Sequence, residues 1–264
     1  MNKDFAITQT DGQDRSTAYD FRNWRVSIDT VIPRVNELKP DVKVSGFTPE
    51  RTVFVRELME ATGLPLDRVT SVSYKPNSLG TEHTLGQARI KTGELWFYKN
   101  MDALPPYALE VSQYEVVVHE LMHINTPFHA GNEIAYGGRE NMRQAAENAI
   151  LVAVQTDNSR SFLSGYHKAL YKELLEGKLA GGQQTFIEET QTILMEQWMV
   201  NEKHVRQVLE AQNPNTVDQI TAQLDQNLLN LMPQFNNIGE IKQHLANLKK
   251  TLIENSKRQN NKLN

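Results

Sequence analysis

The chain has 264 residues, 39% of them hydrophobic and 23% charged, a composition typical of an ordinary globular protein long enough to bury a sizeable core. Its formal net charge of −4 argues against nucleic acid or an anionic membrane surface as the main partner. The absence of cysteine excludes disulfides, thiolate zinc ligands and a cysteine nucleophile, so any bound zinc must be held by nitrogen and oxygen atoms.

The N-terminal segment gives no targeting signal. It lacks an apolar run of signal-peptide length, and no stretch of the chain approaches the roughly 20 apolar residues of a membrane span. We therefore expect no membrane span, and either a cytoplasmic location or export by a route that needs no conventional signal peptide. Residues 1–45 are polar with scattered apolar positions, and we expect a loosely structured lead-in or cap.

A helix and several strands are predicted next along the chain. Residues 50–62 carry apolar positions at helical spacing and are followed by Gly63, which predicts a helix that ends there. Residues 71–75 form one β-rich run. Residues 88–98 form two more around a turn at 91–93, which predicts a pair of strands.

A long helix is predicted over residues 107–125, opened by Pro105 and Pro106 and ended by Pro127. Its second half is almost wholly apolar: Tyr114, Val116, Val117, Val118, Leu121, Met122 and Ile124. A glycine-rich connection then leads to a second predicted helix at about 139–155.

The rest of the chain is predicted to be nearly all helical, because apolar positions recur three and four residues apart between turn signals. The expected helices cover residues 164–176, 184–211, 216–231 and 238–256. We expect Met195, Trp198 and Met199 to belong to a hydrophobic core rather than to a site.

One motif carries chemistry. Residues 119–123 have the pattern His-Glu-x-x-His, and on a helix the positions i and i+4 lie on one face, so His119 and His123 can bind one metal ion. Glu120 lies beside that face, where it can take a proton from a water and later deliver it to a leaving amine. The apolar flanks indicate a buried helix, and burying two histidines and a carboxylate there is costly without a metal or other partners.

Zinc is the expected metal, at one ion per chain. Two neutral imidazoles and one carboxylate are a common catalytic zinc set that leaves a position open for water. Zinc lowers the pKa of a bound water from 15.7 to about 7, which makes hydroxide available at neutral pH.

The motif and its surroundings resemble the zincin metallopeptidases. The predicted strand at 94–98, the helix bearing the motif and the helix that follows have the order of the zincin core. In that clan the edge strand beside the active site pairs with an extended peptide substrate. The resemblance implies this use for the strand at 94–98, which we therefore expect at the sheet edge.

The same region resembles the effector-type zinc proteases of pathogenic bacteria, which share their site logic with clostridial neurotoxin light chains. The resemblance rests on HELMH followed by Glu140, Glu147 and Asn148 in the pattern E-x6-E-N. It implies that Glu140 is the third metal ligand and that Glu147 orients a histidine. It also suggests a bacterial effector or toxin acting in another cell's cytosol.

The third ligand remains open among three residues. After Glu140, Glu147 is the second candidate, since both lie seven residues apart on one face of the second helix. His129 is the third, because it completes the metzincin-like spacing H-E-x-x-H-x5-H, although Thr126 stands where that motif has a glycine.

An oxyanion stabiliser is expected downstream of these helices. The related effector proteases use an arginine and a tyrosine there, which implies a catalytic role for Tyr166 with Arg160. His167 is another donor.

A competing interpretation comes from the stretch after the motif, which resembles the loop of Fic-type nucleotidyl transferases. Four of its residues match that loop: Pro127, Phe128, Gly131 and Asn132. However, Thr126 stands at the catalytic histidine position and 133–134 replace the glycine–arginine pair, so the chain would be a degenerate member. Such a protein would need nucleotide and magnesium, whereas a zincin needs zinc.

The sequence as a whole predicts an α+β, predominantly helical protein. Residues 46–175 would form a zincin-like catalytic domain, and 176–264 a helical C-terminal subdomain. The expected function is a zinc metalloendopeptidase that cleaves a protein or peptide substrate. A third interpretation is a non-enzymatic helical interaction protein.

Overall fold

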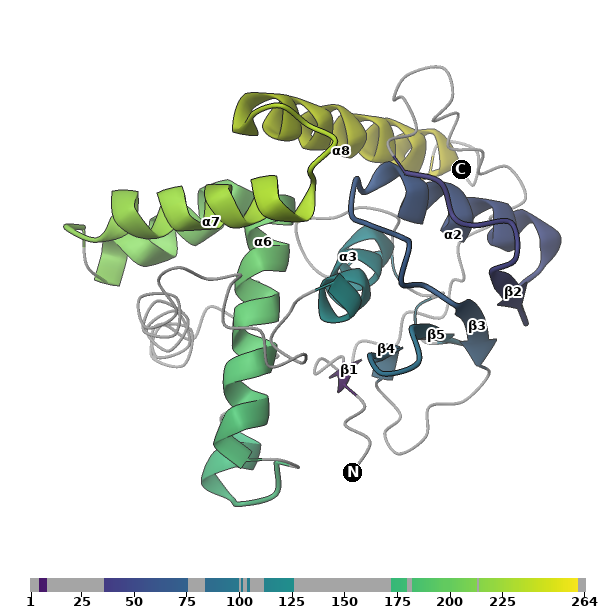
Figure 1. Ribbon diagram of the computed structural model, residues 1–264, viewed down its shortest axis with the longest axis horizontal. Helices are drawn as coiled ribbons and strands as arrows, with labels where there is room; N and C mark the ends of the chain where they lie inside the picture. Colours follow the sequence, from purple (N-terminus) through teal and green to yellow (C-terminus); the bar gives the residue numbers. More distant parts are fainter. Residues whose placement is uncertain are drawn as a thin grey trace. The chain divides into compact units, whose positions relative to one another are not determined.

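Figure 1 shows the computed structural model of the chain, with its helices and strands labelled. The chain divides into two compact units. The first unit joins Met1–Asn125 to Gly239–Asn264, and the second is Thr126–Ile238. The domain boundaries expected from the sequence, after residues 45 and 175, differ from the boundaries of these two units. The structure describes residues 5–8, 36–75, 84–99, 101, 104, 112–125, 172–179, 182–212 and 214–260.

The first unit contains a five-stranded sheet in the order β1-β4-β5-β3-β2. Its strands are β1 (Phe5–Thr8), β2 (Lys43–Ser45), β3 (Ser71–Lys75), β4 (Thr84–Arg89) and β5 (Glu94–Tyr98). Strands β2, β3 and β5 run parallel, while β4 is antiparallel to both of its neighbours, β5 and β1. Together with the helices this confirms the predicted α+β, mostly helical class.

Alternation along the strands gives the sheet an inner and an outer face. Leu95 and Phe97 of β5 are fully buried, and their partners Val72, Ala88 and Gly86 share the inner face. Glu94 and Trp96 alternate with them and face outward. The period of two therefore buries one side of the sheet, as expected for a sheet covered by helices on that side.

Two predictions about the sheet are wrong. Strand β5 (94–98) is not an edge strand, because β3 pairs with one side of it and β4 with the other. Leu95 and Phe97 of β5 are fully buried, as is usual in the interior of a sheet. Residues 1–45 are not merely a lead-in, because Phe5–Thr8 and Lys43–Ser45 form the two outermost strands. Strands this short carry too few residues to show an alternating pattern in the sequence.

Helix α2 (Pro49–Ala61) packs on the inner face and confirms the predicted helix at 50–62. It begins at Thr48, whose Oγ1 accepts a hydrogen bond from the Arg51 amide, with Pro49 in the first turn. Arg51 is 5% exposed and lies over the ring of Tyr74 of β3, with its guanidinium carbon 4.7 Å from the ring centroid. Burial lowers the pKa of Arg51 to about 10.

Helix α8 (Ile238–Asn260) completes the first unit and is attached to the end of α2. The buried Nε2 of His244 lies 2.7 Å from the carbonyl oxygen of Ala61. The last carbonyls of a helix have no partner within the helix, so His244 donates to a group that would otherwise be left buried and unpaired.

The second unit contains α6 (Gly182–Gln212) and α7 (Val217–Leu231), which match the predictions of 184–211 and 216–231. Met195, Trp198 and Met199 are buried, as predicted. The indole Nε1 of Trp198 donates to the carboxylate of Asp225 in α7 at 2.9 Å. Non-helical angles at Asn201 (φ −146°, ψ 56°) divide α6, a break the apolar periodicity did not predict.

None of the described helices is long and apolar enough to cross a membrane.

Candidate metal centre

The helix that carries the His-Glu-x-x-His motif is α3 (Gln113–Asn125). A reciprocal capping box starts it: the Glu115 amide donates to Ser112 Oγ at 3.3 Å, and the Ser112 amide donates to Glu115 Oε2 at 3.2 Å. The predicted helix over 107–125 is therefore wrong at Ser112, which lies before the first turn of α3 and is not helical. Residues 107–111 lie outside the described part of the chain.

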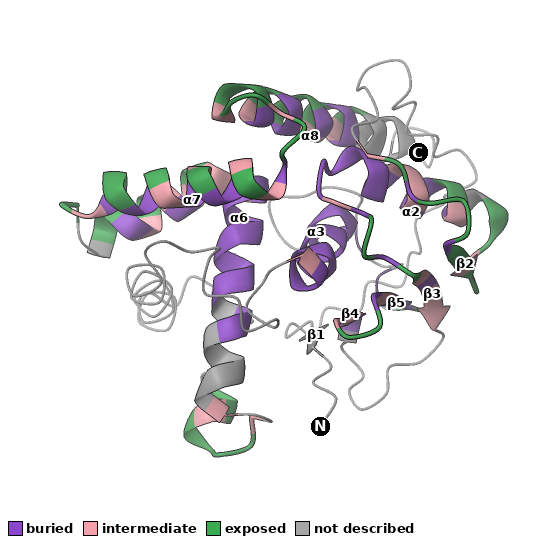
Figure 2. Cartoon of the chain, in the orientation of Figure 1, coloured by how far each residue is buried: buried purple, intermediate pink, exposed green. Residues whose placement is uncertain are grey.

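Helix α3 is buried on every side. All residues from Gln113 to Ile124 are buried, so it is coloured as buried along almost its whole length in Figure 2. At its end the side-chain amide of Asn125 donates to the carbonyls of Pro65, at 2.8 Å, and Leu121, at 3.0 Å. Both ends of the helix are thus fixed, which fixes the direction in which its side chains project.

His119 and His123 face one another on α3. Their Nε2 atoms are 2.9 Å apart, and their rings meet edge to face, with centroids 4.6 Å apart at 77°. Both side chains are fully buried. At this distance one neutral imidazole donates a hydrogen bond to the other, so the two nitrogens point into one small volume.

This pair fits a metal ion. Two nitrogen ligands at 2.0–2.1 Å from a tetrahedral zinc stand about 3.3 Å apart, so the observed 2.9 Å requires only a small rotation of the two rings. An ion between them would replace the one proton that they share. The donor set, neutral imidazole nitrogen in a chain without thiols, suits zinc among the common metals.

Glu120 lies on the side of α3 that faces strand β4. A Cβ atom built on Gly86 would come 2.7 Å from Oε1 and 2.9 Å from Cγ of Glu120, and 3.0 Å from Cγ1 of Val116. Only glycine allows α3 to approach the strand this closely. Glu120 is fully buried, and its carboxylate rests against the backbone of β4.

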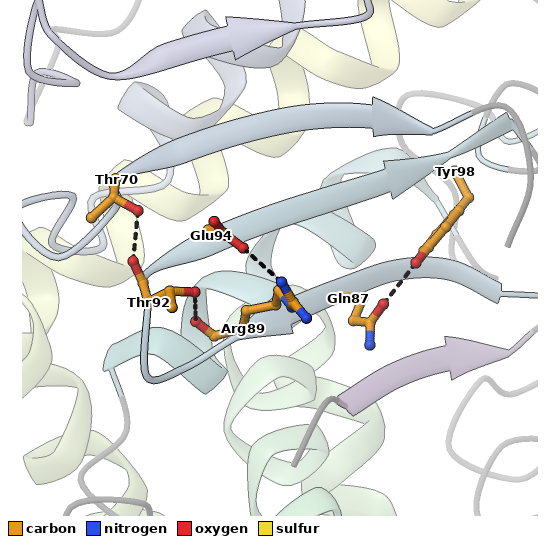
Figure 3. Close-up of polar contacts among 6 residues, drawn as sticks. All are labelled: Thr70, Gln87, Arg89, Thr92, Glu94 and Tyr98. Carbon is orange, nitrogen blue, oxygen red and sulfur yellow. Dashed lines mark hydrogen bonds and ion pairs between the residues drawn. The ribbon is translucent and has the colours of Figure 1, made fainter. Parts of the chain in front are cut away.

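Bonds on the outer face of the sheet hold β4 against β5 (Figure 3). The hydroxyl of Tyr98 donates to Gln87 Oε1 at 2.7 Å, and Arg89 pairs with Glu94 at 3.2 Å. The ring of Trp96 lies beneath the Arg89 guanidinium, 4.4 Å from its centroid. The strand against which Glu120 rests is therefore fixed from the opposite side.

The second unit also contains buried carboxylates among its described residues. Glu188 and Glu189 of α6 are 4% and 2% exposed. The sequence analysis did not single them out, because they follow no recognised spacing from the His-Glu-x-x-His motif.

The other predicted site residues lie outside the described part of the chain. These are His129, Glu140, Glu147, Arg160, Tyr166 and His167, together with the predicted helix at 139–155 and the Fic-like stretch 126–134. Their assignments stay predictions.

In comparisons with known proteins, no protein-family model, curated protein or solved structure matches this chain.

Proposed function

We propose that this protein is a zinc-dependent hydrolase, and that its substrate is a peptide bond in a protein. One observation carries the proposal: two buried imidazole nitrogens face each other at 2.9 Å on a helix that also buries Glu120. A histidine pair with only a structural role needs neither a buried carboxylate next to it nor two nitrogens aimed at the same volume. The expected role as a bacterial effector stays a prediction.

Each of the three motif residues has one task in this proposal. His119 and His123 would hold the metal through Nε2. A bound zinc would polarise the scissile carbonyl and lower the pKa of the attacking water. Glu120 accepts a proton from that water and returns it to the nitrogen of the leaving amine, so one carboxylate serves as base and then as acid. The apolar surroundings exclude bulk water, which strengthens the electrostatic interactions of the metal and of the Glu120 carboxylate with the reacting groups.

The third ligand in this proposal is one of the three residues named by the sequence analysis, Glu140, Glu147 and His129, in that order. A carboxylate with two imidazoles gives the combination of neutral and anionic ligands found in many catalytic zinc sites, which favours the two glutamates.

The test is elemental analysis of protein stripped with a chelator, reloaded with zinc and desalted. We expect about one zinc per wild-type chain and none in His119→Ala His123→Ala. Of the single variants Glu140→Ala, Glu147→Ala and His129→Ala, only the one that removes the third ligand should lose zinc, and the other two serve as its controls.

Glu120→Gln separates catalysis from metal binding. It should retain zinc and lose hydrolysis of an unfolded protein substrate by about 10²–10⁴-fold, the usual contribution of general acid–base catalysis. Wild-type protein that binds no zinc above the double-alanine control would overturn the proposal. Binding of ATP with magnesium would then favour the Fic-like interpretation.

A further inference from the structure

The inner face of the sheet has one position without a side chain. Gly86 of β4 pairs with Phe97 of β5, and Ala88, two residues further along β4, pairs with Leu95. These three neighbours are fully buried and fill the inner face around Gly86. The space of the missing side chain, the Gly86 notch, lies over bare backbone, and a glycine inside a strand often marks a place where another group approaches closely.

The side chain of Glu120 fills the Gly86 notch. A Cβ atom at position 86 would lie 2.7 Å from Oε1 and 2.9 Å from Cγ of Glu120. Ordinary contact begins at 3.4 Å, so one methyl group would force Oε1 from 2.7 Å out to at least 3.4 Å, a displacement of roughly 0.7 Å. The strand therefore locates the carboxylate end of the side chain as well as its stem.

The two elements that enclose the notch are both held in place. Strand β4 is paired with β5 on one side and with β1 on the other. The Tyr98 hydroxyl donates to Gln87, the residue next to Gly86, at 2.7 Å (Figure 3). Helix α3 is fixed by side-chain hydrogen bonds at its start and at its end. An atom added at position 86 would therefore displace the Glu120 carboxylate more readily than the strand or the helix.

We propose that Gly86 is a positioning residue for the general base, because its bare backbone sets where the Glu120 carboxylate stands beside His119 and His123. The inference rests on the proposed hydrolase function. A base must lie within hydrogen-bond reach of the water that it activates, and a misplacement of about 1 Å can cost about 100-fold in rate. The displacement of roughly 0.7 Å is close to that size, so catalysis requires glycine at position 86.

The first test compares Gly86→Ala with wild type on an unfolded protein substrate. We expect kcat to fall by about tenfold or more, with KM and the zinc content unchanged, because the variant moves the base and removes no metal ligand. Gly46→Ala is the matched control, since its new Cβ would press on the carbonyl oxygen of Tyr74 instead. It should lose stability and keep the wild-type kcat per folded chain.

A double-mutant cycle shows whether the effect passes through Glu120. Glu120→Asp shortens the side chain by one carbon–carbon bond of about 1.5 Å, so its carboxylate ends short of the notch. In that background Gly86→Ala should lower kcat by less than about twofold. The same cycle is followed by urea unfolding with EDTA present. Gly86→Ala should lower the midpoint at least about twice as far in the wild-type background as in the Glu120→Asp background.

An unchanged kcat in Gly86→Ala would overturn the positioning role, and equal midpoint shifts in the two backgrounds would overturn the contact on which it depends. If Gly86→Ala does not fold, Gly86→Ala Val116→Ala takes its place in both comparisons, because it also removes the contact at 3.0 Å. Wild-type protein that binds no zinc and hydrolyses nothing would end the hydrolase proposal and the role of Gly86 with it. The unfolding cycle does not depend on zinc, so it identifies failure of the contact separately.

Discussion

Two regions of the first unit bury histidine in different ways. In α8, the Nε2 atom of His244 lies 2.7 Å from the carbonyl oxygen of Ala61, which accepts a hydrogen bond from it. In α3, the imidazole nitrogens of His119 and His123 are 2.9 Å apart, beside the buried Glu120. The first arrangement is complete without an added group. The second brings two imidazoles and a carboxyl group together, and its donor atoms suit a metal ion.

The difference shows why burial alone does not identify a site. Burial lowers the pKa of His244 because desolvation disfavours the charged ring, yet the geometry around it is that of a helix end joined to another helix. What distinguishes α3 is convergence, since imidazole nitrogens from successive turns of one helix point to one volume. Three predictions sharpen this contrast.

The largest effect should come from zinc itself. A ligand that binds only the folded state at 1,000 times its Kd stabilises that state by about 4 kcal/mol. We expect zinc to raise the unfolding midpoint of the wild-type protein and of His244→Gln alike, and to leave His119→Ala His123→Ala unchanged. Thermal denaturation with and without zinc measures all three. A zinc response that disappears in His244→Gln would break the contrast between the two histidine regions.

A smaller effect should follow from Gly86→Ala, since the new Cβ would press on Glu120 and Val116. Overpacking of this kind costs about 1–3 kcal/mol, which chemical denaturation can measure. Glu120→Ala removes the two nearest atoms in conflict and leaves only Cγ1 of Val116, so in that background Gly86→Ala should cost clearly less. If the two costs are equal, α3 does not press on the strand through Glu120.

The smallest effect should be the pH dependence at His244. Its folded-state pKa lies below the unfolded value of 6.5, so its contribution is complete above pH 6.5 and is lost as the pH falls through the folded pKa. We expect His244→Gln to cost about 1 kcal/mol at pH 8, the net value of one hydrogen bond, and less at pH 5. Denaturant titrations of both proteins give this difference, and His204, present in both, cancels. A gap that widens at low pH would contradict the assigned direction.

Much of the local structure could be predicted from the sequence. The limits of α2, β3 and β5 and the apolar core of α3 follow from periodicity and from Gly63 and Gly93. The start of α3 was misplaced, because Pro105 and Pro106 suggested an earlier first turn. Its true signal was the pattern Ser112-x-x-Glu115.

Features that depend on distant pairing could not be predicted. The interior position of β5 depends on which strands align beside it, and four residues at the N-terminus carry no sign that they will pair with β4. The same holds for the site: the spacing within the motif predicts the two histidines and Glu120, whereas the close approach of Glu120 to Gly86 depends on how α3 packs against β4.

The contact between α8 and the end of α2 also bears on the order in which the first unit can fold during synthesis. The first unit consists of two stretches of chain with the whole second unit between them. During synthesis α8 leaves the ribosome only after residues 126–238. The hydrogen bond between His244 and the end of α2 can therefore form only after the whole second unit has been synthesised. A chain interrupted anywhere in residues 126–238 would carry the full His-Glu-x-x-His helix and lack α8, so the carbonyl oxygen of Ala61 would not receive the hydrogen bond from His244.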